Sequence, residues 1–223
     1  MSDMKTLILH SHANGPNPWK VALVLEELGL PYQNKWADFA QIKKEPFLSL
    51  NPNGRVPALE DPNTGISLWE SGAIIDYLVD RYDKDEKLHY ASLSEKYMTR
   101  CWEHFQMSGQ GPYFGQKAWF TVFHAEKIPS AIERYANEIK RVNGVINVHL
   151  EKQGTDYLVG DKITYADLMF IPWARMVPTI APEVDSSGLD KYNAWLDRMC
   201  RRPAVVKVLA EKAKKTAEAQ EGH

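Results

Sequence analysis

Short apolar runs separated by breakers mark the first third of the chain. Residues 6–10 form the first run, and residues 14–18 after it are rich in asparagine, glycine and proline. From Trp19 onward apolar side chains recur at helical spacing until Gly29, with Pro31 just beyond. Glycine and proline are helix stop signals, so the pattern predicts a strand, a turn and a helix that together make a βα unit.

The next fifty residues alternate between extended and turn-like segments. Residues 32–39 predict a second strand, and a polar stretch follows it. A turn with two prolines at residues 51–57 precedes a third short strand, and residues 65–69 form a fourth. A helix follows over residues 73–81, and this order predicts a small mixed sheet with helices on its faces.

From residue 92 onward the strand signals nearly vanish. After a charged linker at residues 83–87, helical periodicity covers residues 93–108, 128–152, 165–175 and 189–200, with a last helix after Pro203. The polar tail, residues 211–223, is expected to fray. The sequence therefore predicts an α/β domain over residues 1–83 and an all-helical domain over residues 92–223.

The composition excludes several classes of function. The chain has 223 residues and a formal net charge of -2, from 27 basic and 29 acidic side chains. A near-balanced charge gives no sequence-independent grip on phosphate backbones, so nucleic acid is not expected as a partner. No apolar stretch approaches the roughly 20 residues that cross a bilayer, and no secretory signal precedes the first strand. We therefore expect a cytoplasmic protein without membrane contact.

The two cysteines, Cys101 and Cys200, lie far apart within helical patterns. Such spacing suggests neither a disulfide framework nor a metal cluster. The expectation is two buried or half-buried free thiols and no metal site.

Pro57 is the most informative residue of the first domain. A proline at the start of a strand cannot donate to the ladder, so it belongs at an edge or a bend. Its peptide bond is either cis or, as the more common alternative, trans. At a bend the backbone N–H and C=O of Val56 turn outward, where they can pair with an extended peptide.

Glu70 and Ser71 lie between a predicted strand and the helix after it. The N–H and hydroxyl of Ser71 at a helix N-terminus suit a carboxylate, and the side chain of Glu70 suits an ammonium group. Together they match the two ends of an amino-acid headgroup. The structural alternative is an N-capping serine beside a favourable acid.

The loop after the first strand carries two asparagines, Asn14 and Asn17, and no cysteine. Dithiol exchange is therefore excluded in this loop. Neutral amide donors stabilise a thiolate by hydrogen bonds to its charged form, which lowers its pKa. The alternative is that both asparagines only satisfy turn geometry.

These features, in this order, resemble the glutathione-binding domain of the cytosolic glutathione transferases. Residues 51–59 are similar to the loop that leads to the cis-proline of that family, and residues 69–74 to its γ-glutamyl-binding motif. In the helical part, residues 158–168 are similar to the family's capping box and hydrophobic staple, with Thr164 as N-cap and Asp167 three residues on.

A closer resemblance is to a fungal subclass that includes the globular domain of the yeast nitrogen-catabolite regulator. It extends from about residue 7 to residue 209, and the segments that carry it are residues 11–17, 102–109, 133–135 and 199–205. The resemblance implies a thioredoxin-like N-terminal domain, an all-helical C-terminal domain and a homodimer.

The resemblance also implies roles for residues at the glutathione site. Val56, held by Pro57, would pair with the cysteinyl backbone of glutathione. Glu70 and Ser71 would hold its γ-glutamyl end.

The glycyl carboxylate and the thiol have several candidate partners. One of Gln41, Lys43 and Lys44 would meet the carboxylate, and the residues leave the choice open. Asn17 is favoured as the partner of the thiolate, and Asn14 is the second choice.

The second substrate would lie against the helical domain. An aromatic-rich segment there suits planar or greasy electrophiles, and the candidate residues are Tyr113, Phe114, Trp119 and Phe120. About half of such rings are expected to be core residues.

The resulting hypothesis is a detoxifying glutathione transferase in which the co-substrate glutathione is bound as a thiolate and attacks a hydrophobic electrophile or a peroxide. The rival hypothesis is a non-catalytic binding or regulatory module with the same fold that acts through a protein partner. Turnover with aryl halides and hydroperoxides discriminates between the two.

Overall fold

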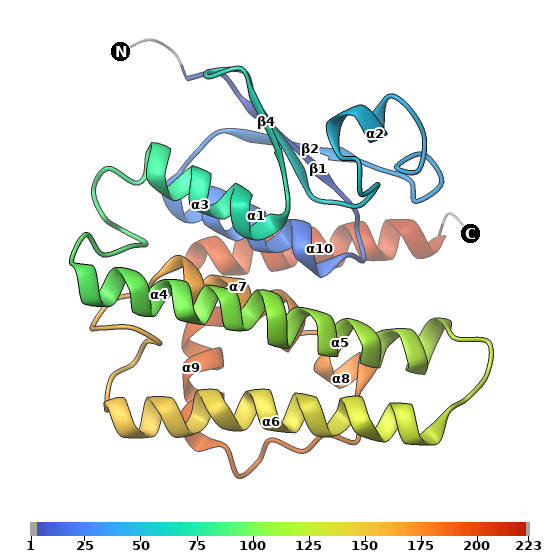
Figure 1. Ribbon diagram of the computed structural model, residues 1–223, viewed down its shortest axis with the longest axis vertical. Helices are drawn as coiled ribbons and strands as arrows, with labels where there is room; N and C mark the ends of the chain where they lie inside the picture. The colour runs from blue at the N-terminus through green and yellow to red at the C-terminus, as the bar shows by residue number, and fades with distance from the viewer. Residues whose placement is uncertain (1–3, 222–223) are drawn as a thin grey trace. The chain divides into compact units, whose positions relative to one another are not determined.

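A four-stranded mixed sheet organises the first of the two units into which the chain divides (Figure 1). The computed structural model describes residues 4–221. One unit comprises the chain up to residue 85 together with the residues from 201 onward, and the other comprises residues 86–200. The elements of the first unit are β1 (Leu7–Ser11), α1 (Pro16–Leu28), β2 (Tyr32–Trp36), α2 (Phe47–Leu50), β3 (Ala58–Asp61), β4 (Ile66–Trp69), α3 (Ser71–Tyr82) and α10 (Pro203–Glu221).

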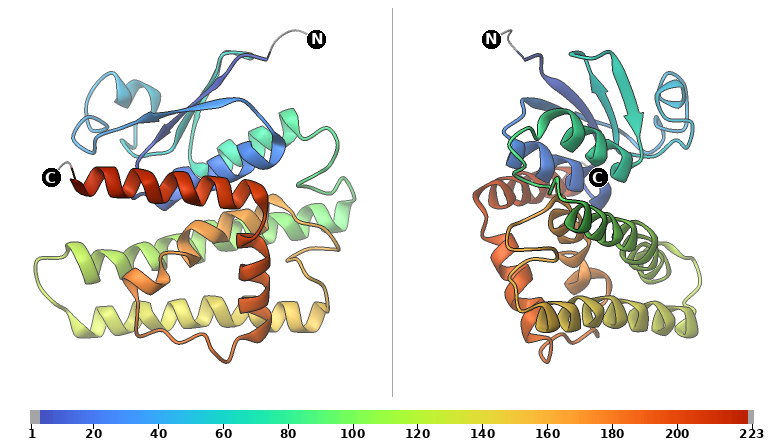
Figure 2. Two further views of the ribbon diagram at one scale, coloured as in Figure 1. Left: turned by 180° about the vertical axis from the view of Figure 1, so that it is seen from behind. Right: turned by 60° about the vertical axis from the view of Figure 1, so that its left-hand side comes forward.

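The strands of this sheet lie in the order β2-β1-β3-β4. β1 pairs with β2 in parallel and with β3 in antiparallel direction, and β4 continues antiparallel to β3. α1 and α3 cover one face of the sheet, and α2 lies on the other (Figure 2). His10 faces α2, because its ring packs edge-on against Phe47 at 5.5 Å, so the alternating residues Leu7 and Leu9 are buried on the helix-covered face.

α1 begins at Pro16, three residues before the helical periodicity predicts. Its first turn contains Pro16 and Pro18, which are tolerated because the first N–H groups of a helix have no intrahelical partner. The helix ends at Gly29, which adopts the left-handed conformation with φ 67°. The loop predicted at residues 14–18 is therefore shorter, and Asn17 belongs to the first helical turn.

Other element boundaries also differ from the prediction. β2 ends at Trp36, three residues earlier than expected, and the short helix α2 forms within a region predicted to be irregular. α3 begins at Ser71 with Glu70 as its N-cap residue, so the alternative of an N-capping serine is wrong by one position. The predicted order of strands and helices is otherwise confirmed.

The C-terminal segment is a helix through Glu221, which corrects the expectation of fraying for residues 211–221; residues 222–223 lie outside the described residues. Glu211 of α10 accepts a hydrogen bond from Asn34 of β2 at 3.0 Å, and the ammonium group of Lys215 lies 5.5 Å from the ring centre of Trp36. α10 packs mainly along α1, and these two side-chain contacts join it to the edge strand β2. By its contacts α10 groups with the first unit, whereas the domain boundaries at residues 83 and 92 stay a prediction.

The second unit consists of helices. Its elements are α4 (Leu93–Phe105), η1 (Gln106–Gln110), α5 (Gly111–Ala118), η2 (Trp119–Phe123), α6 (Pro129–Gln153), α7 (Tyr165–Ala174), α8 (Val177–Ile180) and α9 (Asp190–Cys200). η1 and η2 are single π-helical turns, so the helix predicted to end at residue 108 continues to residue 123. Part of the core lies between α5, α6 and α7, where Phe114, Ile139, Val142 and Trp173 are buried.

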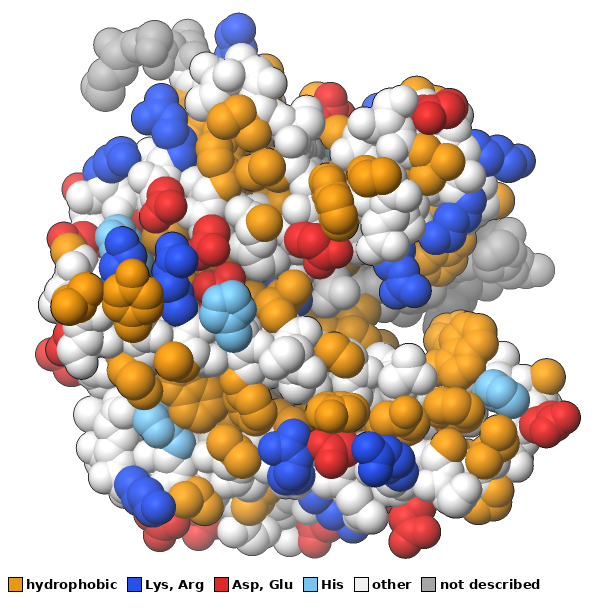
Figure 3. All heavy atoms as spheres, in the orientation of Figure 1, with side chains coloured by type: hydrophobic (Ala, Val, Ile, Leu, Met, Phe, Trp, Pro, Cys, Tyr) orange, Lys and Arg blue, Asp and Glu red, His pale blue; other side chains and the backbone are white. Residues whose placement is uncertain are grey.

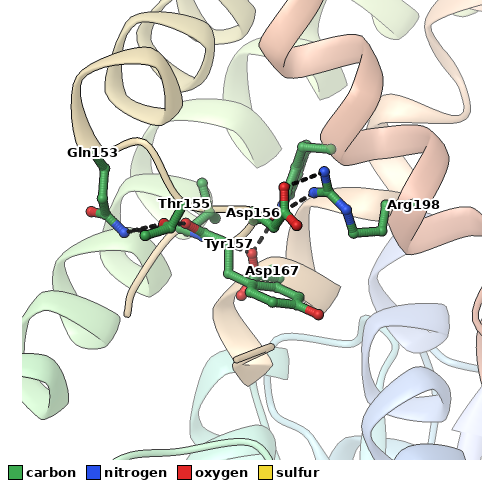
Figure 4. A network of polar contacts seen from close by, with 8 residues as sticks. Gln153, Thr155, Asp156, Tyr157, Asp167 and Arg198 are labelled. Carbon is green, nitrogen blue, oxygen red and sulfur yellow. Dashed lines mark hydrogen bonds and ion pairs between the residues drawn. The ribbon is translucent and has the colours of Figure 1, made fainter. Parts of the chain in front are cut away.

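Asp167 fixes the loop that enters α7 (Figure 4). The capping box predicted from Thr164 and Asp167 is present in full. The buried carboxylate accepts hydrogen bonds from the N–H and hydroxyl of Thr164, both at 2.9 Å, from the N–H of Leu158 at 3.0 Å, and from the indole of Trp195 at 2.9 Å. This single side chain therefore joins the loop, α7 and α9.

Both cysteines carry free thiols, but only Cys200 fits the expected burial, because Cys101 is exposed. Burial raises the pKa of the Cys200 thiol, which makes it a poor nucleophile. Among residues 4–221 we find no helix with both the length and the apolar character that a membrane span requires.

Candidate functional site

A polar cavity of about 380 Å³ opens in the first unit. Its walls come from the start of α1, the loop before β3 and the junction of β4 with α3. The lining residues are Asn17, Asn51, Asn53, Arg55, Val56, Pro57, Glu70 and Ser71. Segments that lie far apart in the sequence thus meet at one cavity. Its lining includes five residues that the sequence predicts for the site, namely Asn17, Val56, Pro57, Glu70 and Ser71.

The loop before β3 is held in shape by Asn51, which is 2% exposed. Its amide nitrogen donates to the carbonyl of Arg55 at 2.6 Å, and its amide oxygen accepts from the N–H of Asn53 at 3.0 Å. The N–H of Gly54 donates to the Asn51 carbonyl at 2.9 Å, and Gly54 adopts a φ of 58°. Because a Cβ on Gly54 would lie 2.8 Å from the Ile42 carbonyl, only glycine fits this turn.

The Val56–Pro57 peptide bond is cis, so the alternative of a trans bond is excluded. β3 begins directly after it, at Ala58. No hydrogen bond between backbone groups of the described residues uses the N–H or C=O of Val56. Both groups therefore remain available to pair with an extended peptide at the wall of the cavity.

The junction of β4 with α3 supplies another wall of the cavity. Ser71, the first residue of α3, is 2% exposed, whereas Glu70 before it is exposed. Glu70 has φ 70° and ψ 118°, a backbone conformation that a residue with a side chain rarely adopts. Strain of this kind is concentrated at functional sites, because it aims groups that an ordinary turn would not.

The structure separates the two asparagines of the first loop. Asn17 is half-buried in the first turn of α1 and lines the cavity. Asn14 is exposed, its N–H donates to the ring of His12 at 3.2 Å, and it does not line the cavity. Geometry therefore favours Asn17 over Asn14 as a group that can reach a bound thiol.

The three candidates for the glycyl carboxylate also separate. A smaller hollow of about 270 Å³ continues from the cavity, shares Asn17, Arg55 and Val56 with it, and is lined by Lys43 as well. Gln41 and Lys44 line neither hollow, and both face a different cavity on the α2 side of the sheet. Only Lys43 of the three borders the candidate site.

Comparison with known proteins decides the family. The model of the glutathione S-transferase N-terminal domain matches residues 5–80, and that of the C-terminal domain matches residues 112–203. The glutathione S-transferase-like protein OpS6 of Beauveria bassiana is 49% identical over 96% of this chain and 99% of its own length. This chain belongs to the glutathione S-transferase family.

Within the glutathione S-transferases the chain falls in the Ure2p-like fungal subclass. The transcriptional regulator URE2 of Saccharomyces cerevisiae is 39% identical over 90% of this chain and 67% of that protein. The glutathione transferase URE2P6 from Phanerochaete chrysosporium, in complex with oxidized glutathione, has a TM-score of 0.89 and 46% identity, and the match covers 96% of this chain and 100% of the other. Ure2p5 from the same fungus, cocrystallized with 1-(S-glutathionyl)-2,4-dinitrobenzene, has a TM-score of 0.86 and 35% identity over 97% and 98% of the two chains. The predicted fold class, a thioredoxin-like domain before an all-helical one, is confirmed.

The aromatic segment of this glutathione S-transferase divides into core and surface rings. Phe114 is fully buried against Trp173, so its prediction as an electrophile-binding residue is not supported, because no surface of the ring is left for a ligand. Tyr113 and Phe120 are half-buried, and Trp119 is 50% exposed. About half of the rings were expected in the core, and one of the four candidates lies there.

Three polar residues of the transferase cavity, Asn51, Asn53 and Arg55, were missed by sequence reasoning. Asn51 shapes the loop, and the exposed Arg55 adds a positive charge beside Val56. The segment of residues 51–54 signalled only a turn, because asparagine and glycine are common turn residues for reasons unrelated to ligands. Among the described residues no group of three or more His, Cys, Asp or Glu side chains could hold a metal ion.

Proposed function

We propose that this chain is a glutathione transferase that binds glutathione in the 380 Å³ cavity and activates it as a thiolate for attack on hydrophobic electrophiles. The observation that carries the proposal is that Asn17, Val56, Glu70 and Ser71, from three separate segments, line one cavity. Relatives of the same subclass support it, since URE2P6 and Ure2p5 are described with oxidized glutathione and with a glutathionyl conjugate.

Each part of the tripeptide meets a group of matching chemistry. The unused N–H and C=O of Val56 pair with the cysteinyl backbone, as an added strand would. Ser71 at the start of α3 binds the γ-glutamyl carboxylate, where the helix N-terminus favours negative charge, and the Glu70 carboxylate binds the ammonium group. Lys43, which faces the adjoining hollow, meets the glycyl carboxylate.

Asn17 activates the sulfur. Its amide donates a hydrogen bond to the thiolate, and its position in the first turn of α1 adds the positive end of the helix dipole. Both effects favour the ionised form and lower the thiol pKa from about 8.5 for a free cysteine. The thiolate then attacks an electrophilic carbon, a carbon–sulfur bond forms, and the leaving group departs with the bonding electron pair.

Peroxide reduction is the proposed side activity. The thiolate attacks the terminal oxygen of a hydroperoxide, the oxygen–oxygen bond breaks, and an alcohol leaves after protonation. The glutathione sulfenic acid that forms is reduced by a second glutathione, which gives the disulfide and water. In both reactions we propose that Tyr113, Trp119 and Phe120 of the second unit bind the apolar part of the electrophile.

The test compares Asn17→Ala with Asn14→Ala, which removes the same amide from an exposed position nearby. Calorimetry measures glutathione binding, ultraviolet titration measures the pKa of the bound thiol, and assays with 1-chloro-2,4-dinitrobenzene and cumene hydroperoxide measure turnover. We expect Asn17→Ala to lower kcat/KM by roughly 10–100-fold, because a hydrogen bond to a charged group contributes about 1.5–3 kcal/mol. Asn14→Ala should leave binding, pKa and turnover unchanged. Equal behaviour of the two variants would contradict the role of Asn17, and absence of glutathione binding would contradict the function.

The same assays decide the regulatory alternative. Similarity to the transcriptional regulator URE2 favours a module that acts through a protein partner. Glutathione binding with an unshifted thiol pKa and without turnover of any electrophile would support that alternative.

We also propose that the transferase is a cytoplasmic homodimer. Leu93, Tyr97 and Met98 of α4 are 75%, 56% and 44% exposed. Figure 3 shows hydrophobic side chains gathered along α4 and the helical segment after it. An apolar surface of this kind is typical of a subunit interface, and sedimentation velocity would detect the dimer.

A further inference from the structure

A second cavity of the first unit shares no lining residue with the glutathione cavity. This α2 cavity lies between α2 and the sheet face that carries His10, and it encloses about 510 Å³. That volume is in the range of about 300–1,000 Å³ that holds a small organic molecule. Its apolar wall is formed by Ile42, Pro46, Phe47 and Leu50.

The floor of the α2 cavity is a satisfied polar pair. The ring of His10, 5% exposed, forms a hydrogen bond of 2.6 Å through Nε2 to the carboxylate of Glu60. The same ring packs edge-on against Phe47. A buried polar group is stable when it is hydrogen-bonded, so this pair gives the cavity a rigid aromatic floor.

The charges around the cavity are paired on the acidic side and unpaired on the basic side. Besides Glu60, the other carboxylate in the lining is Glu45, which accepts from the N–H and hydroxyl of Ser49 at 3.1 and 2.6 Å. The two basic residues are Lys35 and Lys44. No hydrogen bond or ion pair to either ammonium group is present among the described residues. The charged groups of the lining that lack a partner are therefore both positive, and a bound anion would pair with them.

We propose that the α2 cavity binds a planar aromatic carboxylic acid. The aromatic body packs against Phe47 and the apolar wall, and the carboxylate is held by Lys35 and Lys44 through charge-assisted hydrogen bonds. A neutral aromatic molecule leaves both ammonium groups without a partner. A purely polar anion leaves the apolar wall in water, so the combination selects an amphipathic ligand.

The α2 cavity is separate from the glutathione site but adjoins it. Ile42 lines both the α2 cavity and the hollow that contains Lys43, so the two spaces lie on either side of one side chain. Lys43 faces the glutathione side and Lys44 faces the α2 cavity. A test must therefore show that the aromatic acid does not bind in the glutathione cavity instead.

Calorimetric titration with 2-naphthoic acid tests the proposal. We expect saturable binding with one site per chain, and roughly tenfold weaker binding by Lys35→Ala/Lys44→Ala, because two exposed charge pairs together contribute about 1.4 kcal/mol. Lys152→Ala, which removes an exposed lysine of α6, is the matched control and should change nothing. The neutral isostere 2-naphthamide should bind the native protein weakly and should not respond to loss of the two lysines.

A blocking variant and a competitor complete the test. Ala37 lines the α2 cavity, and Ala37→Trp should abolish naphthoate binding while glutathione binding and the melting temperature stay unchanged. If Ala37→Trp does not fold, the exposed lysine pair still decides the question. Displacement of naphthoate by S-hexylglutathione, binding that ignores the lysine substitutions, or no saturable binding at millimolar naphthoate would each overturn the proposal.

Discussion

Two irregular loops, one in each unit, are each held in shape by one buried side chain, but the two loops have different roles. Residues 51–57 are held by the buried amide of Asn51, and residues 158–164 are held by the buried carboxylate of Asp167. In each case one buried side chain bonds to backbone groups of the loop, from within it for Asn51 and from the following helix α7 for Asp167. This arrangement gives an irregular segment a fixed shape without secondary structure.

The two loops differ in what their side chains join and in whether the loop lines the cavity. Asp167 accepts hydrogen bonds from the loop, from the helix cap and from Trp195, and it is fully buried. The side chain of Asn51 bonds only within its own loop, and the backbone groups of Val56 at the end of that loop are not used by the described residues. Both loops have a fixed shape, but only the loop of residues 51–57 ends in the wall of the cavity, where the available backbone groups of Val56 can bind a ligand.

The largest expected effect is that of Asp167→Ala. The substitution leaves several buried donors without an acceptor, so we expect the free energy of unfolding to fall by more than about 4 kcal/mol. Asp167→Asn should fall between the variant and the native protein, because the amide keeps one acceptor and presents a donor to the other groups. Urea unfolding followed by circular dichroism measures both.

The matched control for this prediction is Asp156→Ala, in the same region of the second unit (Figure 4). The Asp156 carboxylate is 67% exposed and pairs with Arg198 at 2.6 Å. An exposed ion pair contributes about 0–1 kcal/mol, so this variant should be nearly neutral. If Asp167→Ala and Asp156→Ala lower the free energy of unfolding equally, burial and the number of donors do not distinguish a structural aspartate from one on the surface.

A smaller loss of stability, joined to a loss of binding, is expected for Asn51→Ala. The substitution leaves the carbonyl of Arg55 and the N–H of Asn53 without their partner, which costs about 1–3 kcal/mol. Because the loop then no longer holds Val56 in place, calorimetry should show at least roughly tenfold weaker glutathione binding. Asn63→Ala, in the turn between β3 and β4, is the control that removes an asparagine from a loop outside the cavity. Glutathione binding that survives Asn51→Ala would show that the loop shape is not needed.

The sequence predicted much of this site because its signals are local. Proline at a strand start and a polar pair at a helix start are each read from adjacent residues, and the structure brings Val56 and Ser71 into one cavity. The role of Asn51 was not predictable, since its partners depend on how the loop returns. The choice among Gln41, Lys43 and Lys44 was also open, because an irregular segment has no periodicity that fixes which side chain faces which cavity.

The last helix was predicted to start after Pro203, but its continuation from residue 211 to Glu221 was missed for a related physical reason. A short polar sequence is marginally helical by itself, and most helical stability in proteins comes from packing. Here the packing partner is α1, more than 170 residues away, and one of the contacts is the ion pair of Lys207 with Glu26. No local pattern reports such a partner.

The turn after β3 is also held by one side chain, that of Asp61. A variant of this turn gives the smallest of the predicted losses of stability, and the loss depends on pH. Asp61 accepts hydrogen bonds from the hydroxyls of Tyr77 and Tyr82 and from the N–H and amide of Asn63. Burial alone would raise the pKa of Asp61, but these donors outweigh it and hold the pKa below its ordinary value. We expect Tyr82→Phe to cost roughly 1.5 kcal/mol at pH 7, since it removes one hydrogen bond to a charged group.

The pH dependence of the stability lost in Tyr82→Phe shows whether the Asp61 carboxyl is charged when it accepts these hydrogen bonds. A carboxyl whose folded pKa is depressed contributes stability above its unfolded pKa of about 3.9, and that stability is lost as the pH falls through the folded pKa. The difference between the native protein and Tyr82→Phe should therefore be full at neutral pH and shrink below about pH 4. Tyr157→Phe, which removes a hydroxyl that forms no hydrogen bond to the described residues, should show no difference at any pH. If the stability lost in Tyr82→Phe stays constant from pH 7 to pH 3, the hydroxyl acts by packing and not through the charge of Asp61. Asp61 would then hold its turn as an uncharged group, as the amide of Asn51 does.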